Sequence, residues 1–149
     1  MMIKLLLAVF GQLIWSGLCS GTEAALFSSN TMKIKQLADE GSTSAKVLLK
    51  IKENMNPAII AIVIQNNIAN IVGTVVATAI ATSVFGSTWI GIFSGVLTGL
   101  VILFSEIIPK TLGAHFWRQL APMTGLALKY LIILFYPFVK LSALLTRQI

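Results

Sequence analysis

Hydroxyl, amide and carboxylate side chains interrupt three long apolar stretches of this sequence. They are Ser16, Ser20 and Glu23 in the first stretch, Gln65, Asn66, Asn67 and Asn70 in the second, and Glu106 in the third. Four-residue steps put Ser16 and Ser20 on one face of a helix, and Asn66 and Asn70 on one face of another. The set offers oxygen donors with no thiolate or imidazole, which suits a hard cation such as Mg²⁺ or Na⁺ and not zinc or copper.

Each of these polar groups also has a structural interpretation. A membrane serine often donates its hydroxyl to a carbonyl of the preceding turn, and asparagines can join helices. Glu23 and Glu106 lie near the ends of their apolar stretches, where a long side chain can reach water. Ionisable groups are costly at membrane depth, so Glu106 is the stronger functional candidate and the role of Glu23 stays open. Three stretches with oxygen donors at compatible depth favour a cation site.

The composition indicates a membrane protein. The 149 residues are 56% hydrophobic and only 11% charged, and the mean hydropathy is +0.89, which is unlike a soluble domain. A net charge of +6 in so apolar a chain is expected to follow the positive-inside rule and not to bind nucleic acid. The sequence has no Ser/His/Asp arrangement, phosphate-binding glycine loop or metal-hydrolase motif, so we do not expect an enzyme.

The apolar stretches predict three transmembrane helices, at about residues 2–28, 57–85 and 89–108. The first also looks like the signal peptide of a secreted protein, but its apolar pattern resumes after Gly21, which favours an uncleaved helix. Residues 29–56 predict a water-facing helical hairpin that breaks at Gly41. The pair Asn56-Pro57 is typical of a helix start.

Charge placement predicts the topology. Five lysines lie in the hairpin, which should therefore be cytoplasmic, with the N-terminus outside and the C-terminus inside. Residues 110–149 are expected to form juxtamembrane helices on the cytoplasmic side, because a fourth span would bury Lys129 and Pro137 interrupts the apolar run. A four-span alternative stays open. The predicted fold is an all-α protein, integral in the cell membrane, with His115 at the surface.

Glycine and proline suggest where helices approach and open. Gly91, Gly95 and Gly99 form a face nearly free of side chains, expected to pack against this chain or a dimer mate. Gly17 and Gly21 allow a local break in the first helix. Pro109 should free carbonyl groups one turn earlier, around Ser105.

The order and spacing of four motifs resemble the transmembrane domain of the CorC/CNNM (cyclin M) magnesium transporters, over essentially the whole chain. The motifs are Ser16-Gly17-Leu18-Cys19-Ser20-Gly21-Thr22-Glu23 leading into Ala25-Leu26-Phe27-Ser28, then Gln36-Leu37-Ala38-Asp39-Glu40-Gly41, Asn66-Asn67-Ile68-Ala69-Asn70, and Ser105-Glu106-Ile107-Ile108-Pro109-Lys110.

The resemblance implies a homodimer with three transmembrane helices per subunit and a belt of juxtamembrane helices. It implies a dehydrated Mg²⁺ bound between the helices by serine, asparagine and glutamate oxygens, and Mg²⁺ export coupled to Na⁺ entry. Carried over by motif position, the expected Mg²⁺ ligands are Ser16, Ser20, Asn70 and Glu106, with Asn66 a weaker candidate.

The sequence departs from the family pattern in two ways. The family often has glycine where Gln65 and Ser105 stand, which changes the expected backbone flexibility. Family members usually continue into cytoplasmic CBS domains, and none is present in these 149 residues, so the chain is either a transmembrane-only form or lacks the rest. The alternative function is a non-transporting membrane protein that senses Mg²⁺ or acts as a scaffold through its basic hairpin.

Overall fold

The structure is a computed structural model that describes residues 1–147, and this part of the chain is all-helical, with no strand. The elements in chain order are α1 (Met2–Ser28), α2 (Thr31–Asp39), α3 (Thr43–Glu53), α4 (Asn56–Phe85), the 3₁₀ turn η1 (Ser87–Trp89), α5 (Ile90–Leu100), the π-helical segment η2 (Val101–Ile107), α6 (Ile108–His115), α7 (Trp117–Leu134) and α8 (Tyr136–Arg147). The all-α prediction is therefore confirmed for the described residues.

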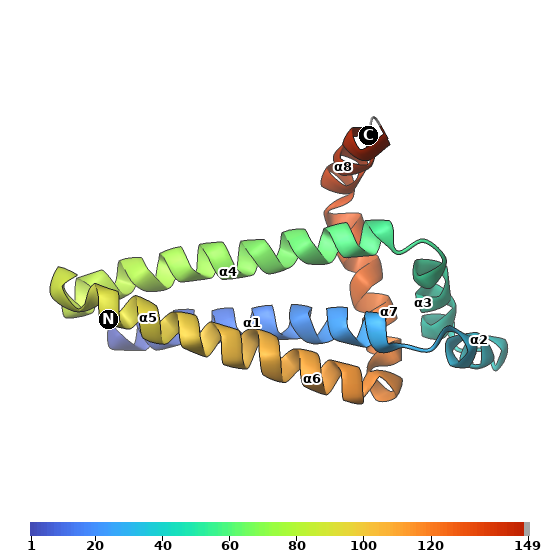
Figure 1. Cartoon of the computed structure of the whole chain (residues 1–149), viewed down its shortest axis with the longest axis horizontal. Coiled ribbons are helices and arrows are strands. Elements are labelled where there is room, and N and C mark those ends of the chain that lie inside the picture. Colours follow the sequence, from blue (N-terminus) through green and yellow to red (C-terminus); the bar gives the residue numbers. More distant parts are fainter. Residues whose placement is uncertain (148–149) are drawn as a thin grey trace.

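Three helical units are long and apolar enough to cross a bilayer, as predicted. They are α1, α4 and the continuous run Ser87–His115 that joins η1, α5, η2 and α6, of 27, 30 and 29 residues. Figure 1 shows the three running lengthwise together, with α1 in contact with both α4 and α6. Most of their large apolar side chains point outward, which suits helices surrounded by lipid.

The third unit does not end near Ile108, because η2 lets the helix pass Pro109. In η2 the backbone bonds span five residues, and the amide of Ile108 donates to the carbonyl of Leu103. Pro109 then occupies the first turn of α6, where its missing N–H costs little, and the helix runs on to His115. The helix therefore includes residues that the sequence pattern assigned to the juxtamembrane region.

The predicted hairpin is formed by α2 and α3. Asn30 and Ser42 cap the two helices with their side-chain oxygens, and Gly41 makes the turn between them at a φ of 97°. Ile34 of α2 and Leu48 of α3 are fully buried in one apolar cluster with residues of α1, α4 and α7. The apolar faces of the hairpin thus pack inside this chain.

The last two helices are bent against each other by 78° at Phe135, next to Pro137. Figure 1 shows α7 crossing the ends of the long helices on the side of the hairpin, and α7 contacts α1, α3, α4 and α6. Lys129 is exposed. A helix that lies across the end of a bundle has the geometry of a juxtamembrane element, and α7 and α8 would form a fourth span only as one bent pair.

Lys52 of α3 fastens the hairpin to the end of the first long helix. Its ammonium donates to the carbonyl of Leu26, at 3.0 Å, in the last turn of α1, where a cation also opposes the negative end of the helix dipole. Partial burial lowers the pKa of Lys52 from its ordinary value.

Replacing Lys52 is expected to loosen this attachment. Lys52→Met should destabilise the docked hairpin by about 1 kcal/mol, the usual net value of one such hydrogen bond. Hydrogen exchange should then be faster in α2 and α3 and unchanged in the middle of α4. Lys50→Met, at an exposed position of the same helix, is the matched control. Equal exchange in both variants would show that the Lys52 bond contributes nothing.

A close helix–helix contact lies between α1 and α6, and not at the predicted glycine face. A Cβ added to Gly113 would lie 3.0 Å from the Cα of Gly21 and closer still to its carbonyl oxygen. A Cβ added to Gly91, Gly95 or Gly99 meets no atom of residues 1–147 within 4 Å. Of the two expected partners of this glycine face, residues 1–147 of this chain are therefore excluded, because α5 turns the face outward, and packing against a dimer mate stays a prediction.

The close contact at Gly113 predicts that adding one methyl group there destabilises the fold. Gly113→Ala should lower the free energy of unfolding by about 1–3 kcal/mol, because the neighbour is backbone and cannot move away easily. Gly11→Ala is the control, since its added Cβ lies in open space on α1. Denaturant titration of both variants in the same detergent tests the difference, and equal stabilities would contradict the close contact.

Candidate cation site

The predicted site begins with a contact between α1 and α4, near the middle of both helices. Ser16 is fully buried, and its hydroxyl donates to Oδ1 of Asn66 at 3.0 Å. The bond fixes the direction of the hydroxyl hydrogen, so the lone pairs of Ser16 Oγ stay available to a cation. Of the predicted site residues, these two are joined directly, and Asn66 orients Ser16.

Two further predicted residues keep buried oxygens without hydrogen-bond partners. Ser20 lies one turn from Ser16 on α1 and is fully buried, and neither its Oγ nor Oδ1 of Asn70 has a partner anywhere in residues 1–147. A buried polar atom left unpaired costs about 1–3 kcal/mol. Such an atom in a stable fold calls for an explanation, and a bound cation is one.

Glu106 lies in the π-helical segment η2, which packs against α1. The neighbouring Ser105 is fully buried and donates its hydroxyl to the carbonyl of Leu13, at 3.1 Å. That bond fixes the position of η2 beside α1 within one turn of Ser16. The carboxylate of Glu106 is partly buried and makes no ion pair with the described residues, and no hydrogen bond links it to the serine and asparagine oxygens.

The sequence predicts that Pro109 frees carbonyl groups around Ser105, and the π-helical pattern of η2 indicates which carbonyl this is. In the π pattern the partner of residue 109 is residue 104, and proline has no N–H to donate, so the Phe104 carbonyl loses that donor. This oxygen lies 3.4 Å from the position of a Cβ built on Gly17. A backbone oxygen of η2 therefore faces α1 beside Ser16.

The expected break at Gly17 and Gly21 does not occur, since α1 is continuous from Met2 to Ser28. Both glycines instead provide close contact with Pro109: a Cβ on Gly17 would lie 3.2 Å from Pro109 Cγ, and one on Gly21 would lie 3.4 Å from the Pro109 carbonyl oxygen. Their small size brings the third span against the first.

The other ionisable residues named by the sequence lie elsewhere. Glu23 forms an ion pair with Lys110 at 3.5 Å, which joins α1 to α6 near the hairpin end. His115 is exposed and stacks edge-on against Phe116, with ring centroids 4.8 Å apart. Glu106 is therefore the carboxylate in the described spans that no basic side chain neutralises.

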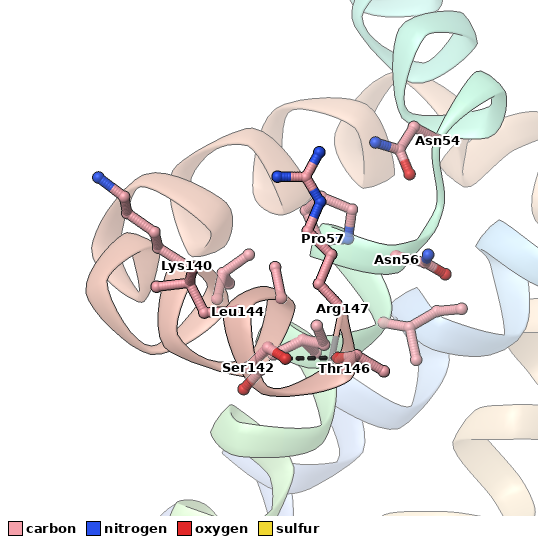
Figure 2. A pocket seen from close by; sticks show the side chains of 12 residues that line it. Asn54, Asn56, Pro57, Lys140, Ser142, Leu144, Thr146 and Arg147 are labelled. Carbon is pink, nitrogen blue, oxygen red and sulfur yellow. Dashed lines mark hydrogen bonds between the residues drawn. The ribbon is translucent and has the colours of Figure 1, made fainter. Parts of the chain in front are cut away.

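A large cavity lies away from these residues, between the start of α4 and α8. Figure 2 shows residues that line it, among them Asn54 and Pro57 around the start of α4 and Lys140, Ser142 and Arg147 of α8. Its volume is about 760 Å³. Because its ionisable groups are a lysine and an arginine, it does not suit a cation, and the site between α1, α4 and η2 stays the better candidate.

One polar residue escaped the sequence pattern. Gln12 lies one turn before Ser16 on the same face of α1, is 5% exposed, and contacts α4. The four-residue series Gln12, Ser16, Ser20 was present in the sequence, and extending it by one turn toward the N-terminus would have included this side chain.

Comparison with known proteins identifies a family over almost the whole chain. Residues 6–149 match the family model described as Cyclin M transmembrane N-terminal domain. A UPF0053 protein of Synechocystis sp. is 42% identical over 146 residues, and one of Haemophilus influenzae is 32% identical over 137. The UPF0053 inner membrane protein YfjD of Escherichia coli is 29% identical over 130 residues.

These matches cover 98%, 92% and 87% of this chain. They cover 42%, 33% and 30% of the three relatives, so the chain spans less than half the length of the proteins it matches.

Proposed function

The chain belongs to the cyclin M transmembrane-domain family and is an integral multi-pass membrane protein, and from this premise we propose that it is the membrane part of a magnesium transporter. Its function is to bind Mg²⁺ between α1, α4 and η2 and carry it across the bilayer, out of the cell, coupled to Na⁺ entry. Lipid is its environment, and a second copy is its partner.

The observation that carries the proposal is the pair of unpartnered buried oxygens, Ser20 Oγ and Asn70 Oδ1, beside the oriented hydroxyl of Ser16. Mg²⁺ takes about six oxygens in an octahedron. Ser16, Ser20, Asn70 and Glu106 supply side-chain oxygens, and the Phe104 carbonyl supplies one from the backbone. Asn66 holds the hydroxyl of Ser16 in place.

The charge balance supports a site that both binds and releases. One carboxylate leaves a bound Mg²⁺ with a net positive charge, and neutral oxygens provide the remaining ligands, so binding is selective without being irreversible. Na⁺ prefers oxygen ligands as well, so an ion entering from the other side can occupy the same donors once Mg²⁺ has left. The helices α1 and α4 would then rock about this point to expose the site to each side in turn.

Topology and assembly follow the same proposal. The hairpin carries five lysines and is cytoplasmic, which puts the N-terminus outside and the C-terminus inside. The open glycine face of α5 is then the surface on which a second copy packs.

The experiment is Mg²⁺ flux in proteoliposomes that contain the purified chain, with and without an inward Na⁺ gradient. Flux that depends on the chain and rises with the Na⁺ gradient is the expected result. Mg²⁺ binding without flux, in vesicles where the chain is folded and inserted, would favour the sensor or scaffold function. Neither binding nor flux would overturn the proposal.

A further inference from the structure

Gln12 holds a buried amide in an apolar environment, one turn from Ser16 toward the N-terminal end of α1. Its Nε2 donates to Oγ1 of Thr74 at 3.0 Å and to the backbone carbonyl of Asn70 at 3.4 Å. With 5% of its surface exposed, the side chain is enclosed between α1 and α4. Neither partner has a charge, so these bonds attach one helix to the other without an ion pair.

The orientation of this amide follows from chemistry. A backbone carbonyl can only accept a hydrogen bond, so the nitrogen of Gln12 must face Asn70. Its Oε1 consequently points away from that carbonyl, and no donor in the described chain reaches it. Asn70 Oδ1 is in the same condition, so two residues in direct contact each keep an unpaired amide oxygen.

The space for Gln12 is provided by a glycine. A Cβ built on Gly73 would lie 2.5 Å from Cγ and 2.7 Å from Cδ of Gln12, which no real contact allows. Gly73 is thus the position on α4 that allows the amide to lie between the helices. An alanine there would force the Gln12 side chain out of its place.

We propose that Oε1 of Gln12 and Oδ1 of Asn70 form a second, uncharged station for the divalent cation, one helical turn from the Ser16 site. The inference rests on the proposed transport of Mg²⁺. Asn70 belongs to both stations, so the ion passes from Glu106 and the serines to Gln12 by exchanging some of its ligands while keeping one.

The chemistry of the second station differs from that of the first. Two neutral amide oxygens leave most of the six Mg²⁺ positions to water, and Mg²⁺ holds such waters firmly. An ion at this station is therefore partly rehydrated and attached more weakly than at Glu106. Transport requires such a step, since an ion must be bound well enough to enter and weakly enough to leave.

Two substitutions separate a cation ligand from a helix clamp. Gln12→Met keeps the length of the side chain and removes both its oxygen and its N–H groups. Gln12→Glu keeps the oxygen, replaces the NH₂ group by a second oxygen and adds a negative charge, so it cannot donate to Asn70 when ionised. Measurements at pH 8 on the whole chain in nanodiscs compare Mg²⁺ affinity by calorimetry, and Mg²⁺ flux is measured in vesicles.

If Gln12 is a cation ligand, Gln12→Glu and Gln12→Met should differ in their affinity for Mg²⁺. Gln12→Glu should bind Mg²⁺ about tenfold more tightly than the native chain, because ligand charge sets the affinity of such sites, and its flux should fall because the ion is retained. Gln12→Met should keep the affinity of the main site within about threefold and lose flux about tenfold. Gly73→Ala should behave like Gln12→Met, with Gly11→Ala as the control that fills open space.

If Gln12 is only a clamp, both substitutions should lower the melting temperature alike and leave Mg²⁺ affinity unchanged, and that result would overturn the inference. If the native chain binds and transports Mg²⁺ in the same experiments, the proposed function is still supported in that case. If the native chain shows neither Mg²⁺ binding nor Mg²⁺ flux, the proposed function is contradicted, and so is the second station.

Discussion

Glu106→Gln is expected to abolish measurable Mg²⁺ flux. The substitution keeps the size of the side chain and removes the negative charge that no basic group neutralises in the described spans. Leaving a buried charge without its counter-charge costs about 3–5 kcal/mol, which corresponds to Mg²⁺ binding weaker by about 100- to 4,000-fold. Calorimetric titration and vesicle flux should both report the loss.

The matched control is Glu23→Gln, which neutralises the other glutamate of the long helices. Glu23 is paired with Lys110 at the hairpin end of α1, with side chains 25% and 47% exposed. A partly exposed pair at the end of the helices contributes about 0–1 kcal/mol, so this variant should transport at close to the native rate. Equal losses in the two variants would mean that the effect comes from general loss of charge and not from a ligand at residue 106.

Ser20→Ala is expected to raise the stability of the Mg²⁺-free chain and to weaken Mg²⁺ binding. Without Mg²⁺, removal of an unpaired buried hydroxyl should stabilise the chain by about 1 kcal/mol. With Mg²⁺, loss of one neutral ligand should weaken binding about tenfold. Thermal unfolding in nanodiscs, with and without Mg²⁺, measures both effects, and the Mg²⁺-dependent increase in melting temperature should be smaller than in the native chain.

Ser83→Ala controls for the change from serine to alanine in a membrane helix. The hydroxyl of Ser83 donates to the carbonyl of Ala79 near the far end of α4, so its loss should leave Mg²⁺ affinity unchanged. A Ser20→Ala chain that is less stable without Mg²⁺ would contradict the unpaired state of its hydroxyl, and unchanged Mg²⁺ affinity would exclude Ser20 as a ligand.

The sequence predicted those features that depend on periodicity and composition. Apolar length identified three spans, and the i, i+4 steps of Ser16 and Ser20 and of Asn66 and Asn70 identified the faces of α1 and α4 that carry the buried oxygens. These predictions succeed because helix geometry turns spacing directly into direction.

Features that depend on contacts between helices were not predictable in the same way. Three glycines on α5 have the spacing of a packing face, yet among the glycines of residues 1–147 the tightest contact is that of Gly113 with the backbone of Gly21, and these two positions share no regular spacing in the sequence. Gln12 continues the four-residue series of Ser16 and Ser20 into a leucine-rich run, but its burial against α4 depends on Gly73, which the spacing within α1 does not reveal. The π-helical turn has no periodic signal, because it changes the period itself.

The π-helical segment η2 holds more residues per turn than an α-helix, so the faces of the third span before and after it are not in the same register. An α-helix advances about 100° per residue, so the one additional residue that a π turn holds displaces everything after it by about that angle relative to everything before it. The glycine face of α5 and the α1-facing side of α6 are therefore set independently, although they belong to one continuous rod. Substitutions on the glycine face of α5 therefore leave the direction of the Glu106 carboxylate unchanged. Deletion of one residue between positions 101 and 104 would instead rotate α5 relative to α6 by about 100° and remove the offset between their faces.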